Sequence, residues 1–246
     1  VHEGNANRGF PTVQAQIAVT DARTGEPAAM LAGTRVTNAR TGCIGGLAVR
    51  HLAAGDGPVH LGVIGAGTQA RWQTRAIDAT RGVESVKIYS PSESRETCAA
   101  DLREEEVDAE AVERAEAAVS DVDVVVTATT ATAPVFPGDA LSPGTLVVAV
   151  GAYTPEMREL DERTVERAGQ LFADVPEEAA ETGDFPAHDE AALTPLSAVF
   201  EGEAGRESSD EIIVVASVGS AVLDAAAASA LFDRAREENV GSDVSL

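Results

Sequence analysis

A short run of small residues, set between a strand-like and a helix-like segment, constrains the fold of this chain more than any other feature. Residues 59–64 are apolar, as in a buried strand, and residues 68–80 are typical of a helix. Between them, residues 65–70 read GAGTQA and fit the pattern G-x-G-x-x-A. Gly65 permits a tight turn, Gly67 lets a ligand approach the main chain, and the closing alanine allows the helix to pack closely on the strand.

The position of this pattern at the start of a helix predicts what the turn binds. Main-chain N–H groups at a helix N-terminus have no partner within the helix and carry the positive end of its dipole, so they suit phosphate groups. The strand, the turn and the helix together predict a dinucleotide site on residues 65–69. The alternative is a purely structural turn between the two elements.

Further strands and helices alternate along the chain, which predicts an α/β fold with a parallel sheet of the Rossmann type. Residues 106–120 fit either a short strand followed by a helix or a helix alone. Residues 176–209 are acidic with few structural signals, and we expect them to be solvated surface; the alternative is that they line the cleft between the two domains. Strands are expected at 59–64, 85–89, 122–128, 145–150 and 212–217, helices at 68–80 and 93–103, and a helix–strand pair at 161–173.

The two ends of the chain predict a second, smaller α+β domain. Alternating side chains over residues 12–20 and the apolar residues 28–31 fit a hairpin, and small or apolar residues recur at helical spacing over 34–53. Turn-forming residues at 55–58 mark a boundary, and 220–238 fit a long alanine-rich helix. We therefore expect a partial substrate and dimerisation domain of 1–55 and 220–246, and a dinucleotide-binding domain of 56–219.

The end of the second strand of the predicted sheet selects between two cofactors. An Asp or Glu at this place binds the adenosine 2′-hydroxyl of NAD(H), but this chain has Ser90 there. The hydroxyls of Ser90 and Ser92 and the guanidinium of Arg95 suit the 2′-phosphate of NADP(H). NADP(H) is therefore favoured, while NAD(H) stays possible because Glu93 offers a carboxylate to a ribose.

Two later strands bring further residues to the same edge of the sheet. Thr127, Ala128 and Thr129 follow one strand, and Val150 and Gly151 end the other. Ligands of open parallel sheets bind at the carboxyl ends of the strands. We expect these residues to face the cofactor, with Gly151 leaving room for the nicotinamide ring.

The charge balance excludes some partners. The chain has 41 acidic and 18 basic residues, a net charge of -23 and no basic stripe, so neither nucleic acid nor an acidic membrane is an expected partner. Lys87 is the only lysine and the acids are spread along the chain, which favours adaptation to a salt-rich cytoplasm over recognition of a cationic partner. No stretch fits a membrane span or a signal peptide. The histidines and cysteines show no metal-ligand spacing, so we expect no metal and two reduced core thiols, Cys43 and Cys98.

Several separated motifs, in their order along nearly the whole chain, resemble the ornithine cyclodeaminase/mu-crystallin family, which also contains alanine dehydrogenases and ketimine reductases. The resemblance, together with the acidity, indicates a haloarchaeal type of member. It implies a homodimer whose subunits have a Rossmann domain and a substrate and dimerisation domain, with a small amino or imino acid as substrate. The motifs are HEGN at 2–5, GFPT at 9–12, TGEP at 24–27, TNART at 37–41, the glycine pattern with Gln69, Pro155 with RELD at 158–161, GR at 205–206, DEI at 210–212, and SVG at 217–219 followed by Asp224.

The resemblance also implies roles for single residues. Arg40 matches the family arginine that clamps the substrate carboxylate, and a guanidinium is suited to a bidentate bond; without the resemblance it would be a surface ion pair of a helix. Thr12 matches a substrate-side position. The predicted cofactor contacts are Thr41, Gly65, Ala66, Gly67, Thr68, Gln69, Ser90, Ser92, Arg95, Thr127, Ala128, Thr129, Val150, Gly151 and Ser217, of which Thr41 and Ser217 come from the resemblance.

Two departures from the family pattern bear on the reaction. Family members carry a substrate-contacting lysine just before the position of His2, so we expect a truncated chain. Cyclodeaminases carry an aspartate two residues after the glycine equivalent to Gly151, where this chain has Tyr153, and a nearby family lysine is replaced by Met157. Without that carboxylate, cyclisation of ornithine lacks its proton carrier, because a phenol is a weaker proton donor.

The sequence therefore predicts an NAD(P)-dependent oxidoreductase that acts on a C–N bond, either a ketimine reductase or an amino-acid dehydrogenase. Hydride transfer to an imine asks the protein to orient the C=N carbon, clamp the carboxylate and supply a proton. Arg40, Thr12 and Tyr153 are the candidate residues on the substrate side. The alternatives are an ornithine cyclodeaminase and a non-catalytic NADP(H)-binding protein of the mu-crystallin type.

Overall fold

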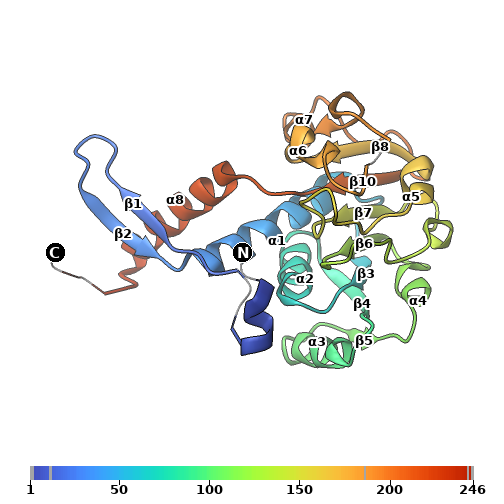
Figure 1. The fold of residues 1–246 in the computed structure, drawn as a ribbon, viewed down its shortest axis with the longest axis horizontal. Helices are drawn as coiled ribbons and strands as arrows, with labels where there is room; N and C mark the ends of the chain where they lie inside the picture. The colour runs from blue at the N-terminus through green and yellow to red at the C-terminus, as the bar shows by residue number, and fades with distance from the viewer. Residues whose placement is uncertain (1–2, 11–12, 186, 243, 245–246) are drawn as a thin grey trace. The chain divides into compact units, whose positions relative to one another are not determined.

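The computed structural model describes residues 3–10, 13–185, 187–242 and 244 (Figure 1). Contacts divide the chain into two compact units, one of Val1–Arg40 with Ser220–Leu246 and one of Thr41–Gly219. The larger unit contains the glycine-rich turn, and the smaller unit contains Arg40. Whether these units serve the roles expected of the two domains stays a prediction.

A parallel eight-stranded sheet forms the larger unit, in the order β5-β4-β3-β6-β7-β10-β8-β9. Every pairing in it is parallel. β6, β7 and β10 are buried at every position, as their continuous β-branched and apolar sequences require when helices cover both faces. The predicted α/β fold class is confirmed. The strands are β3 (Val59–Ile64), β4 (Val83–Tyr89), β5 (Ala109–Ala111), β6 (Val124–Thr127), β7 (Leu146–Ala149), β8 (Ala168–Ala173), β9 (Thr194–Pro195) and β10 (Ile212–Ala216).

Helices connect these strands and cover the sheet. In Figure 1, α2 and α3 lie on one side of the sheet and α4 and α5 on the other. Residues 106–120, which the sequence left open, form a short strand and a short helix, β5 and α4. The helices are α1 (Gly33–Leu52), α2 (Thr68–Arg81), α3 (Ser94–Glu104), α4 (Ala115–Val119), α5 (Glu162–Arg167), α6 (Pro176–Ala180) and α7 (Leu196–Phe200), with 3-10 turns η2 (Gly138–Ala140) and η3 (Glu190–Ala192).

The smaller unit contains the predicted hairpin and the last helix. β1 (Ile17–Thr20) pairs antiparallel with β2 (Pro27–Leu31), and the side chain of Asp21 accepts bonds from main-chain N–H groups in the turn between them. Ser220 is the N-cap residue of α8 (Ala221–Glu238), and its hydroxyl accepts a bond from the main-chain N–H of Val222 at 3.2 Å. This unit also contains η1 (Glu3–Arg8) and the first part of α1.

The expectation of solvated surface over residues 176–209 holds only in part: most of the described side chains there are exposed, but the section is folded and buries several apolar ones. The section forms α6, η3, β9 and α7, and it buries Phe185, Leu193, Leu196 and Val199 almost completely. Leu193, Leu196 and Val199 recur every three residues, but Pro195 interrupts the run and it is too short to predict a helix from the sequence. Cys43 is likewise exposed and not in the core, whereas Cys98 is buried as expected.

The guanidinium of Arg206 forms hydrogen bonds to three connecting segments at one edge of the larger unit. Its Nε donates to the carbonyl of Leu52 at 2.7 Å and its Nη2 to the carbonyl of Gly144 at 3.0 Å. Its Nη1 donates to the carbonyls of Ser208, at 3.2 Å, and Glu211. One guanidinium thus joins the end of α1 to the turns before β7 and β10, which gives the GR motif a structural role.

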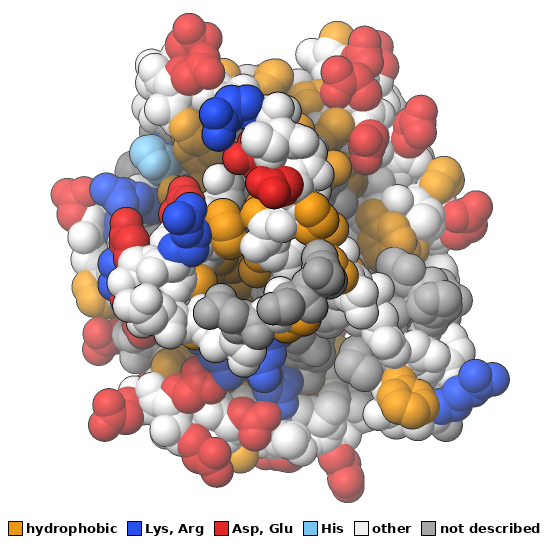
Figure 2. All heavy atoms as spheres, turned by 90° about the vertical axis from the view of Figure 1, so that its left-hand side faces the viewer, with side chains coloured by type: hydrophobic (Ala, Val, Ile, Leu, Met, Phe, Trp, Pro, Cys, Tyr) orange, Lys and Arg blue, Asp and Glu red, His pale blue; other side chains and the backbone are white. Residues whose placement is uncertain are grey.

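Acidic side chains are scattered over the face drawn in Figure 2, with few basic ones among them. None of the helices in the described ranges is long and apolar enough to cross a membrane.

Candidate cofactor and substrate site

The glycine-rich turn follows β3 directly and needs a glycine at its first position. Gly65 has a φ of 107°, and its N–H donates to the carbonyl of Tyr89 on β4 at 2.8 Å. A Cβ at this position would lie 2.5 Å from the carbonyl oxygen of Ala128, which follows β6. Both the conformation and the crowding exclude a side chain here, because L residues rarely adopt such a φ.

Gly67, the second glycine of the turn, is open where Gly65 is crowded. It is the N-cap residue of α2 with a φ of -83°, and a Cβ there would meet no atom within 4 Å. A glycine supplies no side chain to cap the helix, so the first N–H groups of α2 are left for a ligand. Thr68 is exposed and Gln69 half-buried at this helix start, while Ala70 is fully buried against the sheet. The turn therefore has the form that a diphosphate group requires.

Arg71, which the sequence motif does not mark, holds the carbonyl side of the same turn. Its Nη1 donates to the carbonyls of Ala66 at 2.8 Å and Gly67 at 3.1 Å. Its Nε and Nη2 donate to Asp101 on α3 at 2.8 and 2.5 Å. The carbonyl oxygens that would repel a phosphate are thus bound to a guanidinium, which leaves the N–H side of the turn for the ligand.

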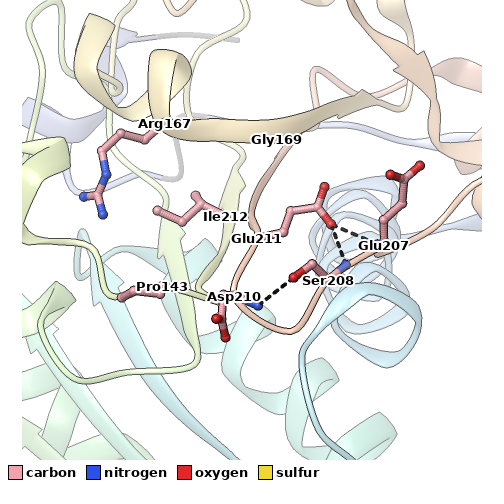
Figure 3. A pocket seen from close by; sticks show the side chains of 8 residues that line it. All are labelled: Pro143, Arg167, Gly169, Glu207, Ser208, Asp210, Glu211 and Ile212. Carbon is pink, nitrogen blue, oxygen red and sulfur yellow. Dashed lines mark hydrogen bonds between the residues drawn. The ribbon is translucent and has the colours of Figure 1, made fainter.

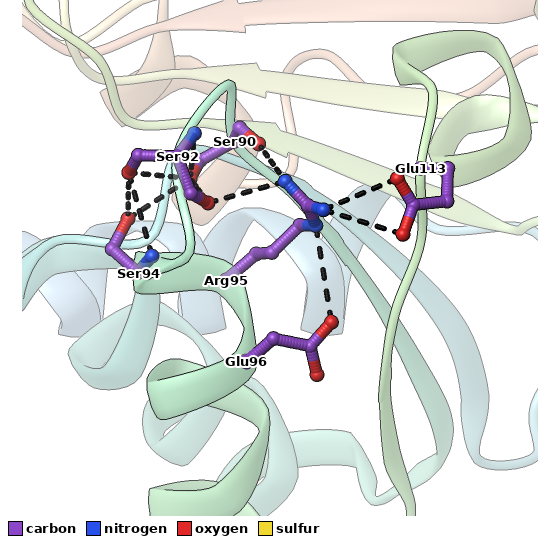
Figure 4. Close-up of polar contacts among 6 residues, drawn as sticks. All are labelled: Ser90, Ser92, Ser94, Arg95, Glu96 and Glu113. Atoms are coloured by element: carbon purple, nitrogen blue, oxygen red, sulfur yellow. Dashed lines mark hydrogen bonds and ion pairs between the residues drawn. The ribbon is translucent and has the colours of Figure 1, made fainter.

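The turn between β4 and α3 brings together three serines and Arg95 (Figure 4). The hydroxyl of Ser90 lies 2.9 Å from that of Ser94, and the hydroxyl of Ser92 lies 2.8 Å from it. Arg95 donates through Nη1 to the carbonyls of Ser90 and Ser92 and through Nη2 to the carboxylate of Glu113 at 3.2 Å. Glu113 is 83% exposed, so its carboxylate lies at the surface. The residues predicted to bind a 2′-phosphate therefore form one cluster. The exposed side chain of Glu113 pairs with the guanidinium of Arg95 in this cluster.

A buried carboxyl group joins the carboxyl ends of β6 and β7. Glu159 accepts bonds from the hydroxyl of Thr127 at 2.7 Å, from the N–H and hydroxyl of Thr129 at 2.6 and 2.8 Å, and from the N–H of Gly151 at 2.8 Å. Burial raises the pKa of Glu159 to about 7, against the opposing effect of the bonds from both threonines. Three predicted cofactor positions are thus brought together by a residue to which the sequence assigned no function.

Asp174, at the end of β8, makes a similar set of contacts with the segment that follows β10. Its carboxylate accepts bonds from the hydroxyl of Ser217 at 2.7 Å and from the N–H groups of Val218 and Gly219, both at 3.0 Å. Ser217 is a predicted cofactor contact, and Asp174 fixes the direction of its hydroxyl. Polar residues at three separate strand ends therefore share the edge of the sheet where the glycine turn lies.

Arg40, in the smaller unit, is paired with an acidic residue of α8. Its Nε lies 3.2 Å from Oδ2 of Asp224, whose Oδ1 accepts a bond from the hydroxyl of Thr37 at 2.8 Å. The Arg40 side chain is 13% exposed and that of Asp224 is 25% exposed. The carboxylate therefore holds one edge of a largely buried guanidinium. Thr12, the other predicted substrate residue of this unit, lies outside the described residues.

A cavity of about 410 Å³ opens at the opposite edge of the sheet, near the amino ends of β8 and β10 (Figure 3). The carboxylate of Glu211 beside it already accepts bonds from the side chain of Gln170 and the N–H of Glu207, both at 2.9 Å. This cavity is therefore remote from the predicted contacts and is lined by groups engaged in structural bonds. Among the described residues, no group of three or more His, Cys, Asp and Glu side chains could hold a metal ion.

The comparison with known protein families decides the relationship of this chain. The model of the ornithine cyclodeaminase/mu-crystallin family matches residues 1–239. The chain belongs to this family. A Delta(1)-pyrroline-2-carboxylate reductase of Bacillus cereus is 36% identical over 98% of this chain and 77% of its own length.

Solved structures share the fold of this chain as well. The Delta(1)-pyrroline-2-carboxylate reductase of Thermococcus litoralis, in complex with NADH and L-proline, matches with a TM-score of 0.91 and 34% identity over 98% of this chain and 78% of that one. An archaeal alanine dehydrogenase dimer with bound NAD matches with a TM-score of 0.89 and 30% identity over 100% of this chain and 78% of that one.

Tyr153 and Met157, which the resemblance predicts to replace an aspartate and a lysine of cyclodeaminases, lie beyond the end of β7. Tyr153 is 45% exposed, and Met157 is 8% exposed. Thr41, predicted to contact the cofactor, lies on α1, and its carbonyl accepts a bond from the side chain of Gln73 at 2.9 Å.

Proposed function

We propose that this chain is an NAD(P)-dependent oxidoreductase that acts on the C–N bond of a small amino or imino acid, as a ketimine reductase or an amino-acid dehydrogenase. The observation that carries the proposal is the open glycine turn at the start of α2, in a chain 36% identical to a Delta(1)-pyrroline-2-carboxylate reductase. Membership of the family and the open turn together support a bound nicotinamide cofactor.

The predicted cofactor and substrate residues would have separate roles. The main chain of Gly65–Gln69 would hold the diphosphate, and the ends of β6, β7 and β10, with Gly151, would hold the nicotinamide half. Arg40 would anchor the substrate carboxylate, with Thr12 and Tyr153 as the other candidate substrate residues. The cofactor supplies or accepts a hydride when bound; the protein orients the C–N carbon, keeps the carboxylate in place and exchanges a proton.

Imine reduction suits these residues better than cyclisation of ornithine. Ring closure with loss of ammonia needs a group that carries protons to and from nitrogen, and Tyr153 stands where cyclodeaminases place a carboxylate. Reduction of a preformed C=N bond asks for less acid–base chemistry at this position. The substitution therefore favours the reductase or dehydrogenase reaction.

An assay with Δ1-pyrroline-2-carboxylate tests the proposal. Purified protein should oxidise NADPH or NADH in the presence of this imine, with loss of absorbance at 340 nm. The assay includes molar KCl as well as dilute buffer, because the net charge of -23 is the basis of our proposal that the protein is adapted to salt. Ammonia release from ornithine with no net change in the cofactor would select a cyclodeaminase. Tight NADPH binding without turnover of any imine, or of a keto acid with ammonia, would select a non-catalytic binding protein.

The two glycines of the turn should respond differently to alanine. Gly67→Ala is expected to leave the melting temperature unchanged, because its φ is ordinary and its Cβ meets no protein atom, yet to raise the Kd for the cofactor at least about 10-fold. Gly65→Ala is expected to lower the free energy of unfolding by about 1–3 kcal/mol, because it combines a positive φ with a main-chain clash. Calorimetric melting and titration measure both effects. Full cofactor affinity in Gly67→Ala would contradict a diphosphate site at this turn.

We propose that NADP(H) is preferred over NAD(H), because Ser90, Ser92 and Arg95 form one cluster and Ser90 stands at the position where an acid would bind the 2′-hydroxyl of NAD(H). Arg95→Ala is expected to lower kcat/KM for NADPH about 10- to 100-fold, since a bond to a charged group contributes about 1.5–3 kcal/mol. The value for NADH should change less than about 3-fold. Glu113→Gln is the matched variant: it removes the carboxylate that faces Arg95 at 3.2 Å and should improve kcat/KM for NADPH. Equal losses with both cofactors in Arg95→Ala would contradict the preference.

We propose that the smaller unit binds substrate and joins two copies into a homodimer. Its hairpin and last helix expose Met30 at 66%, Val222 at 73% and Leu231 at 48%, and among the residues of α8 only Ala228 is buried. An isolated two-stranded hairpin is marginally stable, so a second copy that covers these side chains would stabilise the unit. The structure of an archaeal alanine dehydrogenase dimer within the family supports this proposal. Light scattering that gave only the mass of a monomer would contradict it.

A further inference from the structure

Glu159 is a buried acidic residue that is not among the residues predicted to contact the cofactor or the substrate. It lies between β7 and α5, and its exposed fraction is 0%. A buried carboxylate is costly unless hydrogen bonds or opposite charges compensate it. Here the compensation comes from hydrogen-bond donors at the carboxyl edge of the sheet.

The donors to Glu159 come from two strand ends and use both of its oxygens. Oε1 accepts bonds from the N–H and hydroxyl of Thr129, and Oε2 accepts bonds from the hydroxyl of Thr127 and the N–H of Gly151. Each oxygen therefore has one main-chain N–H donor, which cannot turn into an acceptor. A carboxylate satisfies all four donors, whereas an amide in its place would turn its NH2 group toward a main-chain N–H.

The surroundings leave Glu159 little freedom to move. A Cβ on Gly151 would lie 2.4 Å from Oε1, so only glycine fits against the carboxyl group. Behind it, Asp184 accepts bonds from the main-chain N–H groups of Glu159 at 2.6 Å and Leu160 at 2.8 Å. The carboxyl group is held on one side by its own main chain and contacts the predicted cofactor edge on the other.

We propose that Glu159 is a positioning residue that, as a carboxylate, holds the ends of β6 and β7 in the arrangement that binds the nicotinamide half of the cofactor. This inference rests on the proposed function, because it assumes that Thr127, Thr129 and Gly151 face the cofactor. Glu159 lies behind these residues and acts through them.

The charge of Glu159 predicts a dependence on pH. Burial raises its pKa to about 7, the neighbouring Asp184 carboxylate adds to this rise, and the bonds from Thr127 and Thr129 oppose it. The pKa of Asp184 is itself raised by burial, with the positive charge of Arg158 acting in the opposite direction. Because the pKa of Glu159 is raised, its carboxylate predominates above about pH 7 and is lost below it.

Titration calorimetry with NADH and with ADP-ribose, which lacks the nicotinamide, tests the inference. In the wild-type protein, the Kd for NADH should rise about 10-fold from pH 8 to pH 6, in proportion to the loss of carboxylate, while that for ADP-ribose changes less than about 2-fold. Glu159→Gln should weaken NADH binding at pH 8 at least about 10-fold, remove the pH dependence and leave ADP-ribose binding intact. Wild-type affinity for NADH in Glu159→Gln, or equal losses for both ligands in folded protein, would overturn the inference.

Thr129→Val provides the test that does not depend on how well Glu159→Gln folds. It removes one hydroxyl donor and keeps the other three bonds, so the pKa of Glu159 should rise and the midpoint of the NADH pH profile should move to higher pH. A residue with a merely structural role would leave this midpoint in place, and an unchanged midpoint overturns the inference. Wild-type protein that binds neither NADH nor NADPH at any pH would instead refute the proposed function, and the inference with it.

Discussion

Arg40→Met is expected to lower kcat/KM for the imine at least about 30-fold, because truncating one partner of a buried charge pair costs about 2 kcal/mol or more. The affinity for the cofactor should not change, since Arg40 belongs to the smaller unit and the glycine turn to the larger one. Steady-state kinetics with the imine varied, and calorimetric titration with the cofactor, measure the two effects. Arg40→Lys should lie between wild type and Arg40→Met, because it keeps the charge and loses the bidentate geometry.

Asp224 provides the control for this prediction. In Arg40→Met its carboxylate loses the guanidinium at 3.2 Å, so part of the loss could come from an unpaired acid on α8. Arg40→Met combined with Asp224→Asn removes both charges and should restore stability while the imine is still bound poorly. Recovery of kcat/KM in the double variant would show that Arg40 serves the helix and not the substrate.

Arg206→Ala is expected to lower the free energy of unfolding by about 3 kcal/mol or more, and the melting temperature by about 6–12 °C for a domain of this size. The guanidinium bonds to the carbonyls of Leu52, Gly144, Ser208 and Glu211, and without it these acceptors lose a charged donor. Calorimetric melting measures the change.

Arg163→Ala is the matched control for Arg206. Its side chain is 52% exposed and pairs with Asp139 at the surface, so its removal should leave the melting temperature nearly unchanged. At a temperature where the Arg206→Ala variant is folded, this variant should bind the cofactor with the affinity of the wild type. If Arg206→Ala lost no more stability than Arg163→Ala, the structural role of Arg206 would be refuted.

The sequence was most informative where a local pattern carries its own physical meaning. The glycine turn is recognised because a strand, a positive φ and a helix start must follow one another within a few residues, and the structure has all three at Ile64–Thr68. The central strands were predictable because burial on both faces requires unbroken apolar runs. In the smaller unit, the hairpin and α8 were predicted from alternation and composition, and only their ends differ from the prediction.

The residues that the sequence did not reveal act on partners far away in the chain. Glu159 bonds to a threonine 32 positions earlier, Arg71 to an aspartate 30 positions later, and Arg206 to a carbonyl 154 positions earlier. Such side-chain contacts leave no period in the sequence, because each depends on which loops the sheet brings together. Two of these residues lie in motifs of the sequence, Glu159 in RELD and Arg206 in GR. Only the structure shows that Glu159 contacts the carboxyl edge of the sheet, whereas Arg206 joins connections that stabilise the fold.

The strand order has a consequence for how the chain assembles. β10 follows β8 and β9 in the chain but lies between β7 and β8 in the sheet, so it provides the link between those two strands. During synthesis from the N-terminus, the section from residue 168 to 211 therefore emerges before the strand that attaches it to the growing sheet. The acidic residues scattered through 176–209 would keep this waiting section soluble until β10 arrives.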